Sequence, residues 1–581
     1  MSLKSIYTRF APEFVKALRR NIRISLQNRD RSRYRKMIEE EPPFTPVTLS
    51  CKPLISVLIP VYNVKPSYLR ACIDSVTNGY YDNYEICIAD DCSTDPKVRE
   101  TLRFYEGTDR IKIVYRSENG HISRATNSAL ELATGEFCAF LDCDDVLSPD
   151  ALYSVAKVLN DNRDYDLIYS DEDKIDDRGR RSEPSFKPVY SPDTLMSLMY
   201  ISHLSVVRTS LLRKLGGLRV GFEGAQDYDM TLRLVERIPE KNICHIPRVL
   251  YHWRKVKGST SSDTTEKSYI REANERAVSE AMERRGYKGR VEYIDILSQY
   301  RPLYDPGDVT VSVVIPSKDN PDIWERCVRS LMTRSKGVRI KLVTVDNGSS
   351  DENRSKYEAV SRELGIKYVY KKEDFNFSAM CNRGAAASDG ELLFFLNDDT
   401  ELLTEDSICR MAGQAELPHV GAVGAKLLYP DRESIQHIGV IMIEQGPSHA
   451  FSGRKDDPLH PLRQARNIAD FNYLAVTGAA LMIERKKFDD AGGFDESFPI
   501  AYNDVEFCMR LEERGYHCVV RTDAVFIHYE SMSRGDDRAD PEKFKRLTHE
   551  LSRLREAHPA YSSHDPYYNI NMDQRNVNFT V

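Results

Sequence analysis

Carboxylates gather directly after short apolar runs in this chain of 581 residues. The run FCAFL, for example, is followed by Asp142, Asp144 and Asp145. Three carboxylates this close repel one another unless a cation or hydrogen bonds compensate. Carboxylate oxygens are ligands that Mg²⁺ or Mn²⁺ prefers, and such a metal usually keeps phosphate oxygens and waters as its other ligands. The run therefore predicts a metal site for a diphosphate, with a solvated acidic turn as the alternative for an isolated run.

Two further carboxylate positions could complete such a site. Asp90 and Asp91 follow the apolar run YEICIA, where a carboxylate can accept hydrogen bonds from a base or a ribose, or simply cap the next helix. Asp227 opens an expected helix in QDYDMTLRL, with Arg233 on its next turn. A positioned carboxylate that takes a proton from an attacking hydroxyl contributes typically ~10²–10⁴-fold to the rate. Asp227 is therefore the candidate general base, and helix capping is the alternative.

The same order of motifs returns in the second half of the chain, which indicates a duplication. The offset is 256 residues for the first motifs and 276 to 277 for the last, so we expect loop insertions in the second half. The matched pairs are Ile55–Pro60 with Val311–Pro316, Ile88–Asp95 with Thr344–Asp351, Gly135 with Gly390, Asp227 with Asp504, and His252 with His528.

Alternating strands and helices must position these residues. Each repeat starts with an apolar run that reaches a proline, Pro60 or Pro316, and continues with an amphipathic stretch and a second apolar run. This order predicts an α/β fold with a parallel sheet, in which ligands bind at the carboxyl ends of the strands. We expect a helix over 264–286 and a linker over 301–308. The expected segments are a basic helical extension (1–50), two domains of one fold (51–300 and 301–545), and a C-terminal helix and tail (546–581).

Composition excludes several classes of protein. A hydrophobic content of 41% is ordinary for a globular protein, and a net charge of −7 gives no footprint for nucleic acid. The twelve cysteines form no CxxC pair, so free thiols are expected rather than zinc ribbons. The chain shows neither an apolar run of membrane-spanning length nor the apolar core of a signal peptide, so we expect it in the cytoplasm.

The first 36 residues differ from the rest of the chain. They hold eleven Lys and Arg residues against Glu13 and Asp30, and Phe10, Phe14, Leu18 and Ile22 fall on one helical face. A basic amphipathic helix can lie on an anionic membrane surface. Packing on the protein itself, or a solvated arm, are the alternatives.

In combination, the motifs resemble a known family over residues 52 to 572. IPVYN, ADDCSTD, FLDCDD, QDYDMTLR and LYHWR resemble the first domain of bacterial family-2 glycosyltransferases with the GT-A fold, a Rossmann-like nucleotide-sugar fold. VDNGSSD, FLNDDTEL, NDVEFCMRL and HYESMSRG resemble the rhamnosyl- and galactofuranosyl-transferase branch of that family. The resemblance implies two tandem catalytic domains.

It also implies a function. The expected enzyme is a metal-dependent inverting glycosyltransferase that moves sugars from a UDP- or TDP-sugar to a glycan acceptor on a lipid carrier, in O-antigen, capsule or cell-wall rhamnan synthesis. The implied roles are nucleotide binding for Asp90, Asp91 and Asp346 beside Pro60 and Pro316; Mn²⁺ or Mg²⁺ binding for Asp142, Asp144 and Asp399 with His252 and His528; general base for Asp227 and Asp504; and donor or acceptor contacts for Asp145, Asn397, Asp398, Arg233 and Arg510. The two histidines could also be ordinary polar residues near a loop.

The second repeat departs from the stricter pattern. Asn397 stands where the first repeat has Asp142, and Asn347 stands where it has Asp91. The loss of two negative charges implies weaker metal binding, a different donor or a degenerate site. We expect both domains to be active with distinct donors or linkages, and the alternative is a second domain that only binds glycan or scaffolds partners. Neither the basic Gly-rich loop of a nucleotidyltransferase nor the GxGxxG of a NAD-dependent enzyme follows the first strand.

Overall fold

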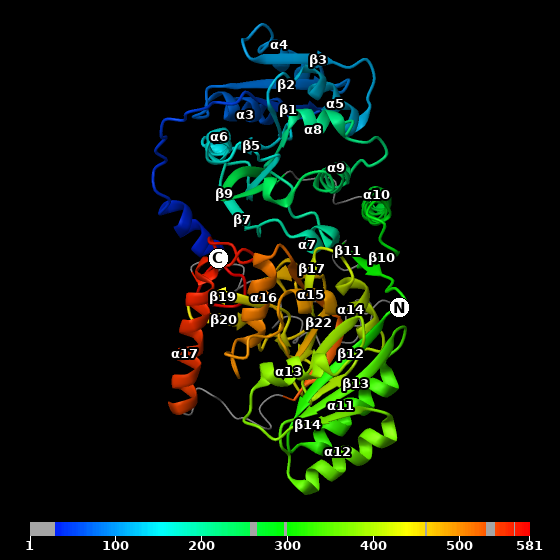
Figure 1. Ribbon diagram of the computed structural model, residues 1–581. Helices are drawn as coiled ribbons and strands as arrows, with labels where there is room; N and C mark the ends of the chain where they lie inside the picture. Colours follow the sequence, from blue (N-terminus) through cyan, green and yellow to red (C-terminus); the bar gives the residue numbers. More distant parts are fainter. Residues whose placement is uncertain (1–29, 256–263, 295–298, 459–461, 530–540, 563) are drawn as a thin grey trace, which may run out of the picture. The chain divides into compact units, whose positions relative to one another are not determined.

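The computed structural model describes residues 30–255, 264–294, 299–458, 462–529, 541–562 and 564–581 (Figure 1). The basic helical face expected over Phe10 to Ile22, and with it the expected membrane contact, lies outside the described residues. The chain divides into two compact units. The first comprises the residues up to Tyr190, together with Leu198–Gly286 and Val581, and the second comprises Ser191–Ser197 and Tyr287–Thr580.

A mixed sheet with the order β3-β2-β1-β4-β8-β6-β9-β5 forms the centre of the first unit, and β7 pairs with β6. Strands β1, β2, β3 and β4 are parallel to one another. The strands are β1 Ile55–Val61, β2 Tyr84–Asp90, β3 Ile111–Tyr115, β4 Phe137–Phe140, β5 Val146–Leu147, β6 Leu167–Ile175, β7 Arg181–Ser185, β8 Ser205–Arg208 and β9 Ile243–Arg254. The helices are α3 Pro66–Thr77, α4 Pro96–Arg103, α5 His121–Leu132, α6 Ala151–Asp161, α8 Thr209–Lys214, α9 Gln226–Val235 and α10 Thr264–Arg284, the last as expected for 264–286.

The second unit repeats this topology with the order β14-β13-β12-β15-β22-β17-β23-β16. Each strand takes the place of its counterpart, so the duplication predicted from the sequence is confirmed. The main strands are β12 Thr310–Ser317, β13 Arg339–Asp346, β14 Lys367–Tyr370, β15 Leu392–Leu396, β16 Thr400–Leu402, β17 Val420–Leu428, β22 Ala480–Glu484 and β23 His517–His528; β18 Ile435–His437 pairs with β17, β21 Phe471–Tyr473 with β23, and β19 Val440–Ile443 with β20 Gly446–His449. The helices are α7 Pro192–Ser197, α11 Pro321–Arg334, α12 Asp351–Leu364, α13 Phe377–Ala386, α14 Ser407–Ala415, α15 Arg485–Asp490, α16 Asn503–Glu513, α17 Pro541–Ala557 and α18 Pro559–Ser562.

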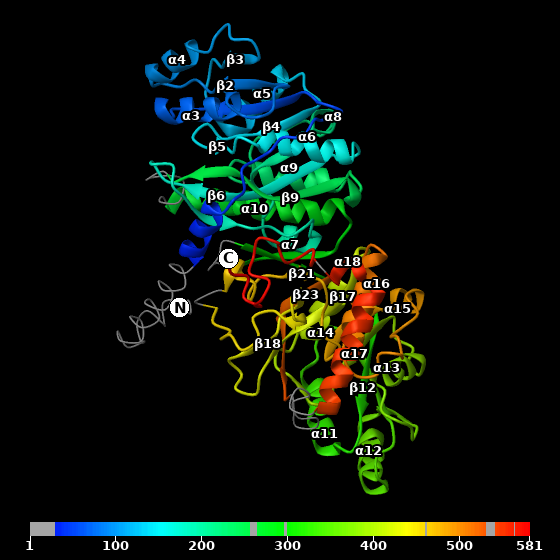
Figure 2. The same cartoon turned by 90° about the vertical axis from the view of Figure 1, so that its left-hand side faces the viewer.

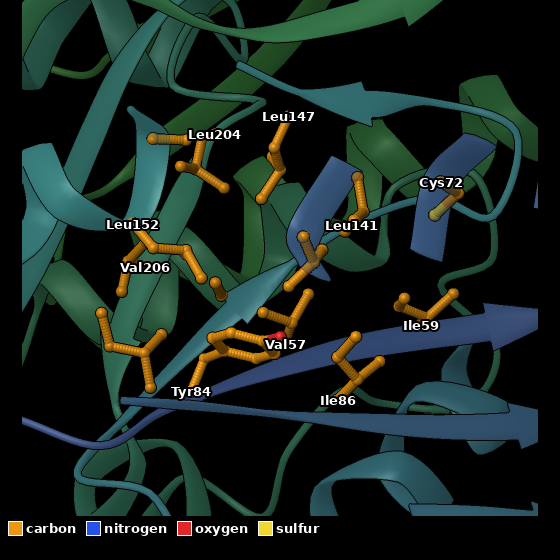
Figure 3. Close-up of a cluster of buried hydrophobic side chains, with 14 of the residues drawn as sticks. Val57, Ile59, Cys72, Tyr84, Ile86, Leu141, Leu147, Leu152, Leu204 and Val206 are labelled. Atoms are coloured by element: carbon orange, nitrogen blue, oxygen red, sulfur yellow. The ribbon is translucent and has the colours of Figure 1, made fainter. Parts of the chain in front are cut away.

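Buried apolar strands fix the positions of the acidic strand ends. Strand β1 contributes Val57 and Ile59 to a core cluster that β2 completes with Ile86 (Figure 3). Helix α3 begins with Pro66 at its first turn, where the missing N–H costs nothing. It covers the strands with Leu69, Cys72, Ile73 and Val76, which recur at helical spacing. The carboxyl ends of the parallel strands therefore lie together at one edge of the sheet.

The first half of the expected linker over 301–308 is instead a strand. Strand β11, Gln299–Tyr304, pairs antiparallel with β10, Gly289–Ile294, and the second unit starts at Tyr287 rather than at residue 301. The physical reason lies in Arg301, whose buried guanidinium donates to Thr522 Oγ1 at 3.0 Å and lies 3.5 Å from Asp470. Among the helices of the described residues, none combines the length and apolar character needed to cross a bilayer. Figure 2 shows the chain from the side.

Candidate functional sites

One cavity of the first unit brings together three of the predicted residues. Pro60, Asp142 and Asp227 line it, together with His203, which the sequence had not indicated. Pro60 lies near the carboxyl end of β1, Asp142 follows β4, and Asp227 lies in the first turn of α9. The cavity thus lies at the carboxyl ends of the parallel strands, where ligands bind in sheets of this kind.

Asp227, the expected base, lies in surroundings that raise its pKa. Its side chain is half-buried and accepts a hydrogen bond from the Tyr228 N–H at 2.9 Å. Burial raises the pKa of the Asp227 carboxyl, the negative charge of Asp142 raises it further, and His203 and the Tyr228 N–H counteract part of this rise. A carboxylate with a raised pKa accepts a proton more readily than an exposed one.

The other two carboxylates of the acidic run have different surroundings. Asp145 is fully buried and accepts hydrogen bonds from Tyr251 Oη at 2.6 Å and the Arg254 N–H at 2.7 Å. It therefore ties the run to β9 and does not line the cavity. Burial, followed by the nearby charge of Asp142, raises the pKa of the Asp144 carboxyl. This crowding of negative charge is what a bound cation would relieve.

Asp90 and Asp91 are held by their own loops. Asp90 accepts from the Ser93 N–H at 3.2 Å and lies 3.4 Å from Arg99 Nε. Asp91 accepts from the Gly120 N–H at 2.9 Å and from Arg116 Nε at 2.8 Å. Both carboxylates are buried at the end of β2, and neither lines the cavity of Asp142 and Asp227.

His252 also lies away from that cavity. Its Nδ1 is 2.5 Å from Asp173 Oδ1, and Asp173 Oδ2 accepts from Tyr34 Oη and Arg181 Nε, each at 2.6 Å. A carboxylate that accepts from Nδ1–H leaves the lone pair on Nε2, which is the arrangement of many metal-binding imidazoles. Tyr34 belongs to the helix over 30–39, so part of the N-terminal extension packs into the first unit.

The second unit has a cavity at the matching place. Asn397, Asp504 and His528 line it, together with His437 and His449. Asp504 accepts from the N–H groups of Gly478 at 2.8 Å and Val505 at 2.9 Å. His528 Nε2 lies 3.0 Å from Asp399 Oδ1, and its Nδ1 lies 2.6 Å from Gln436 Oε1. The expected base and the expected metal ligands are therefore close together in this unit as well.

The remaining predicted residues of the second unit are held by neighbouring loops. Asp346 accepts from the N–H groups of Gly348 and Ser349, each at 2.8 Å, and from Tyr368 Oη at 2.5 Å. Asp398 accepts from Ser317 Oγ at 2.6 Å, directly after Pro316. Pro316 lies in β12 beside Val345 of β13 and does not line the cavity.

Arg233 and Arg510, expected as donor or acceptor contacts, line neither cavity. Arg233 is buried and donates to the carbonyl oxygens of Leu215 at 3.0 Å and Gly217 at 2.9 Å. Arg510 makes the same pair of bonds, at 2.7 Å each, to the carbonyl oxygens of residues 491 and 493. The guanidinium groups thus fasten α9 and α16 to the loops before them.

The donor set suits a hard divalent metal. Within the described residues, no three His, Cys, Asp or Glu side chains are grouped closely enough to form a cage for an ion. Magnesium-type sites need no such cage, since one or two carboxylates suffice when substrate phosphates and waters supply the other ligands. Asp142 with Asp144, and Asp399 with His528, fit that description.

Three imidazoles of the cavities were missed by sequence reasoning. His203 lies two residues before β8, and His437 and His449 lie in β18 and β20. None of them recurs at the offset of the repeat, so the search for repeated motifs passed over them. Burial, with the nearby His449 and His528, lowers the pKa of His437 well below its usual range, so this ring is neutral.

Comparison with known proteins gives two matches to one family model. The model described as Glycosyl transferase family 2 matches residues 56–216 and again 312–478. The chain is 39% identical to the uncharacterized protein y4gI of Sinorhizobium fredii, over 91% of this chain and 58% of that protein. It is 36% identical to the O-antigen biosynthesis protein RfbC of Myxococcus xanthus, over 90% of this chain and 40% of that protein. The chain therefore spans about half the length of these curated relatives. A solved structure of S. aureus TarS with UDP-GlcNAc matches 40% of this chain and 72% of its own, at 20% identity and a TM-score of 0.31.

Proposed function

Because the chain belongs to glycosyl transferase family 2, we propose that each unit transfers a sugar from a nucleotide-diphosphate donor to a glycan acceptor. One observation carries this proposal. In both units, a carboxylate in the first turn of a helix, Asp227 or Asp504, shares a cavity with a side chain that follows β4 or β15, Asp142 or Asn397. The proposed base and the proposed diphosphate site thus line one cavity in each unit.

The chemistry proceeds by a single displacement. Asp227 takes the proton of an acceptor hydroxyl, and that oxygen attacks the anomeric carbon on the side opposite the leaving diphosphate. The anomeric centre inverts, and no covalent sugar–enzyme bond forms. Asp504 has the same task in the second unit, where the N–H groups of Gly478 and Val505 hold its carboxylate in place.

A divalent metal, Mn²⁺ or Mg²⁺, would be held by Asp142 and Asp144 in the first unit and by Asp399 and His528 in the second. When bound, it supplies positive charge that offsets the charge developing on the leaving diphosphate. Asp145 keeps the acidic run in place through Tyr251 and Arg254. In this proposal His252, oriented by Asp173, has its Nε2 available as a further ligand.

The residues at the ends of β2 and β13 suggest the sugar donor, and one relative suggests the acceptor. Asp90, Asp91 and Asp346, at the ends of β2 and β13, would bind the base and ribose of a UDP- or TDP-sugar. The relative RfbC carries the description O-antigen biosynthesis, which supports a surface polysaccharide as the product. We place the acceptor on a lipid carrier at the cytoplasmic face of the inner membrane, with the basic N-terminus on that surface.

A second candidate function applies to the second unit alone. Asn397 and Asn347 replace two carboxylates of the first unit, and this replacement favours a unit that binds glycan without catalysis. We favour catalysis, because Asp504, Asp399 and His528 all keep their places around the cavity.

Asp227→Asn and Asp504→Asn test the proposal, because each change keeps the shape of the side chain and removes the base. The readout is transfer from UDP- and TDP-linked sugars, with Mn²⁺, to a lipid-linked acceptor. Each variant is expected to lose one of the two linkages, because the rate of sugar transfer by the changed unit falls by at least about 10²-fold. Asp161→Asn and Asp490→Asn, both at exposed positions, are the matched controls. A single variant that makes full-length product at the normal rate identifies its unit as non-catalytic.

A further inference from the structure

His203 occupies the wall of the first cavity between the two ends of the proposed reaction. Its Nε2 lies 3.7 Å from Asp142 Oδ2. The same imidazole lines the cavity together with Asp227. In the proposed displacement, the anomeric carbon lies between the leaving diphosphate, near Asp142, and the acceptor oxygen, near Asp227. A side chain that neighbours both carboxylates therefore faces the sugar that is transferred.

The ring of His203 is held in a fixed orientation. The main-chain N–H of His203 donates to Glu172 Oε2 at 3.1 Å, and its carbonyl oxygen accepts from the buried ammonium group of Lys187. The imidazole stacks on Tyr251, with ring centroids 4.5 Å apart and planes inclined by 12°. Tyr251 is itself fixed by its hydrogen bond to Asp145. A side chain that recognises a hydroxyl needs a fixed orientation, which the main-chain hydrogen bonds and the stacking on Tyr251 provide here.

This support does not use the ring nitrogens of His203. Nδ1 is buried and has no hydrogen-bond partner in the part of the chain that the structure describes. Nε2, at 3.7 Å from Asp142, is beyond hydrogen-bond distance. Since no acceptor among the described residues faces Nδ1, a ring proton on Nε2, at the Asp142 side of the cavity, leaves no buried donor unpaired. Among the residues that the structure describes, that N–H has no acceptor within hydrogen-bond distance.

We propose that His203 Nε2–H donates a hydrogen bond to a hydroxyl oxygen of the transferred sugar and thereby selects the donor of the first unit. The inference rests on the function proposed above, since it takes the diphosphate to lie near Asp142 and the acceptor near Asp227. A site built to bond a hydroxyl discriminates strongly against a donor that lacks it, because the N–H is then left unpaired.

The second unit places a different residue at this point. Val206 pairs with Ala139 in the first sheet, and Met482 pairs with Phe394 in the second, so the strands correspond at an offset of 276. The counterpart of His203 is therefore Ala479, which also lines its cavity but offers no donor side chain. Imidazoles reach the second cavity from β18 and β20 instead. The two units therefore differ in the group that faces the sugar, and we infer that they take different sugars.

His203→Phe tests the proposal, because phenylalanine keeps the stacking on Tyr251 and lacks the N–H. The intact chain with Asp399→Asn, which weakens the second site, is titrated with Mn²⁺ and either the nucleoside diphosphate or its sugar conjugate. The probe is the conjugate that binds the parent best among UDP-, TDP- and GDP-linked hexoses. The affinity for the diphosphate is expected to stay within about twofold. The affinity for the conjugate is expected to fall by about tenfold, the effect of one lost hydrogen bond.

Two variants control for effects on the fold. His203→Gln retains an N–H donor and is expected to recover part of the lost affinity for the conjugate. His245→Phe alters another imidazole that stacks on a tyrosine, Tyr169, and contacts a carboxylate, Asp171 at 2.9 Å, but does not line the cavity. It is expected to leave both affinities unchanged.

The outcomes separate the two levels of the proposal. If the parent binds neither diphosphates nor conjugates, the proposed function itself is wrong. If the parent binds both and His203→Phe weakens both equally, or weakens neither, the assignment of His203 to the sugar is overturned while the proposed function stands.

Discussion

At the residue scale, the two units balance the charge beside the second parallel strand in different ways. In the first unit, Asp91 pairs with Arg116 at 2.8 Å. In the second, Asn347 stands at that place, and the nearby cation, Arg383, pairs with Glu373 instead. The Glu373 N–H donates to the Asn347 carbonyl oxygen at 3.1 Å. The negative charge beside this strand is therefore carried by Glu373 in the second unit, while the side-chain Oδ1 of Asn347 is buried without a hydrogen-bond partner among the described residues.

Glu85 is a buried carboxylate whose removal should cost stability without touching either cavity. It is 5% exposed and accepts hydrogen bonds from Ser56 Oγ at 2.6 Å, Lys112 Nζ at 2.6 Å and the Thr134 N–H at 2.5 Å. Glu85→Gln keeps the shape of the side chain but replaces one carboxylate oxygen, which accepts hydrogen bonds, by an NH₂ group, which donates them. We expect a loss of about 3 kcal/mol in the free energy of unfolding at pH 7, measured by urea titration. The exposed Glu118→Gln should change it by less than about 0.5 kcal/mol.

The same residue gives a pH dependence with a definite sign. Burial alone would raise the pKa of Glu85, but the hydrogen bonds from Lys112, Ser56 and Thr134 outweigh it and lower the pKa from 4.5 to about 2. A group whose pKa is lower in the folded state stabilises the fold above the unfolded pKa and loses this effect as pH falls. The stability difference between the parent and Glu85→Gln should therefore be constant above pH ~5 and shrink between pH 4.5 and 2. A difference that grows toward acid pH contradicts this assignment.

At the element scale, one glycine in each repeat lets the first and fourth strands of the parallel part approach each other. A Cβ on Gly135 would lie 2.6 Å from the Leu54 carbonyl oxygen, and a Cβ on Gly390 would lie 2.6 Å from that of Thr310. Both glycine N–H groups donate to a serine hydroxyl of the neighbouring strand at 2.9 Å. The match of these glycines in the repeat thus reflects the packing of the backbone.

Gly135→Ala and Gly390→Ala are expected to destabilise the chain by about 1–3 kcal/mol each, because main-chain atoms must move to make room for the methyl group. Thermal and urea unfolding provide the measurement. Gly307→Ala is the matched control, since its added methyl group meets only the end of the flexible Glu416 side chain, at 3.1 Å. Equal free energies of unfolding for all three variants would show that the strands can move apart without loss of stability.

The local pattern was sufficient for the strands that the repeat marks, because β1 is an apolar run that reaches Pro60, and β2 and β4 are apolar runs with acidic ends. It was insufficient for β11, whose Arg301 and Pro302 read as a linker until the partners of the buried guanidinium are known. The residues of the sites were likewise predictable only in part. Asp142 and Asp227 were predicted from their motifs, and one cavity joins them, but their roles stay predictions. His203 could not be found, because an isolated histidine carries no pattern and its meaning comes from Tyr251 and Asp142 around it.

At the scale of the whole molecule, a segment of the first repeat belongs to the second unit. All residues of α7 are buried, and Asp193 accepts hydrogen bonds from Gln414 Nε2 at 2.5 Å and Asn472 Nδ2 at 2.7 Å. Asn472 Oδ1 accepts in turn from the N–H groups of Asp193 at 3.0 Å and Thr194 at 3.1 Å. Burial would raise the pKa of Asp193, but His419 and Asn472 more than offset this and lower it. The duplicated units are therefore not separable by a single cut of the chain.

Asn472→Ala in the intact chain tests this coupling. The change removes the acceptor of two N–H groups and a donor to the buried Asp193 carboxylate, so we expect a loss of about 3 kcal/mol in the free energy of unfolding. Because Leu198 follows α7 directly and His203 lies five residues further along, release of α7 should also weaken donor binding by the first unit. The exposed Asn78→Ala serves as the control. If Asn472→Ala lowers stability but leaves the donor affinity of the first unit unchanged, α7 anchors the second unit alone and does not support the first cavity.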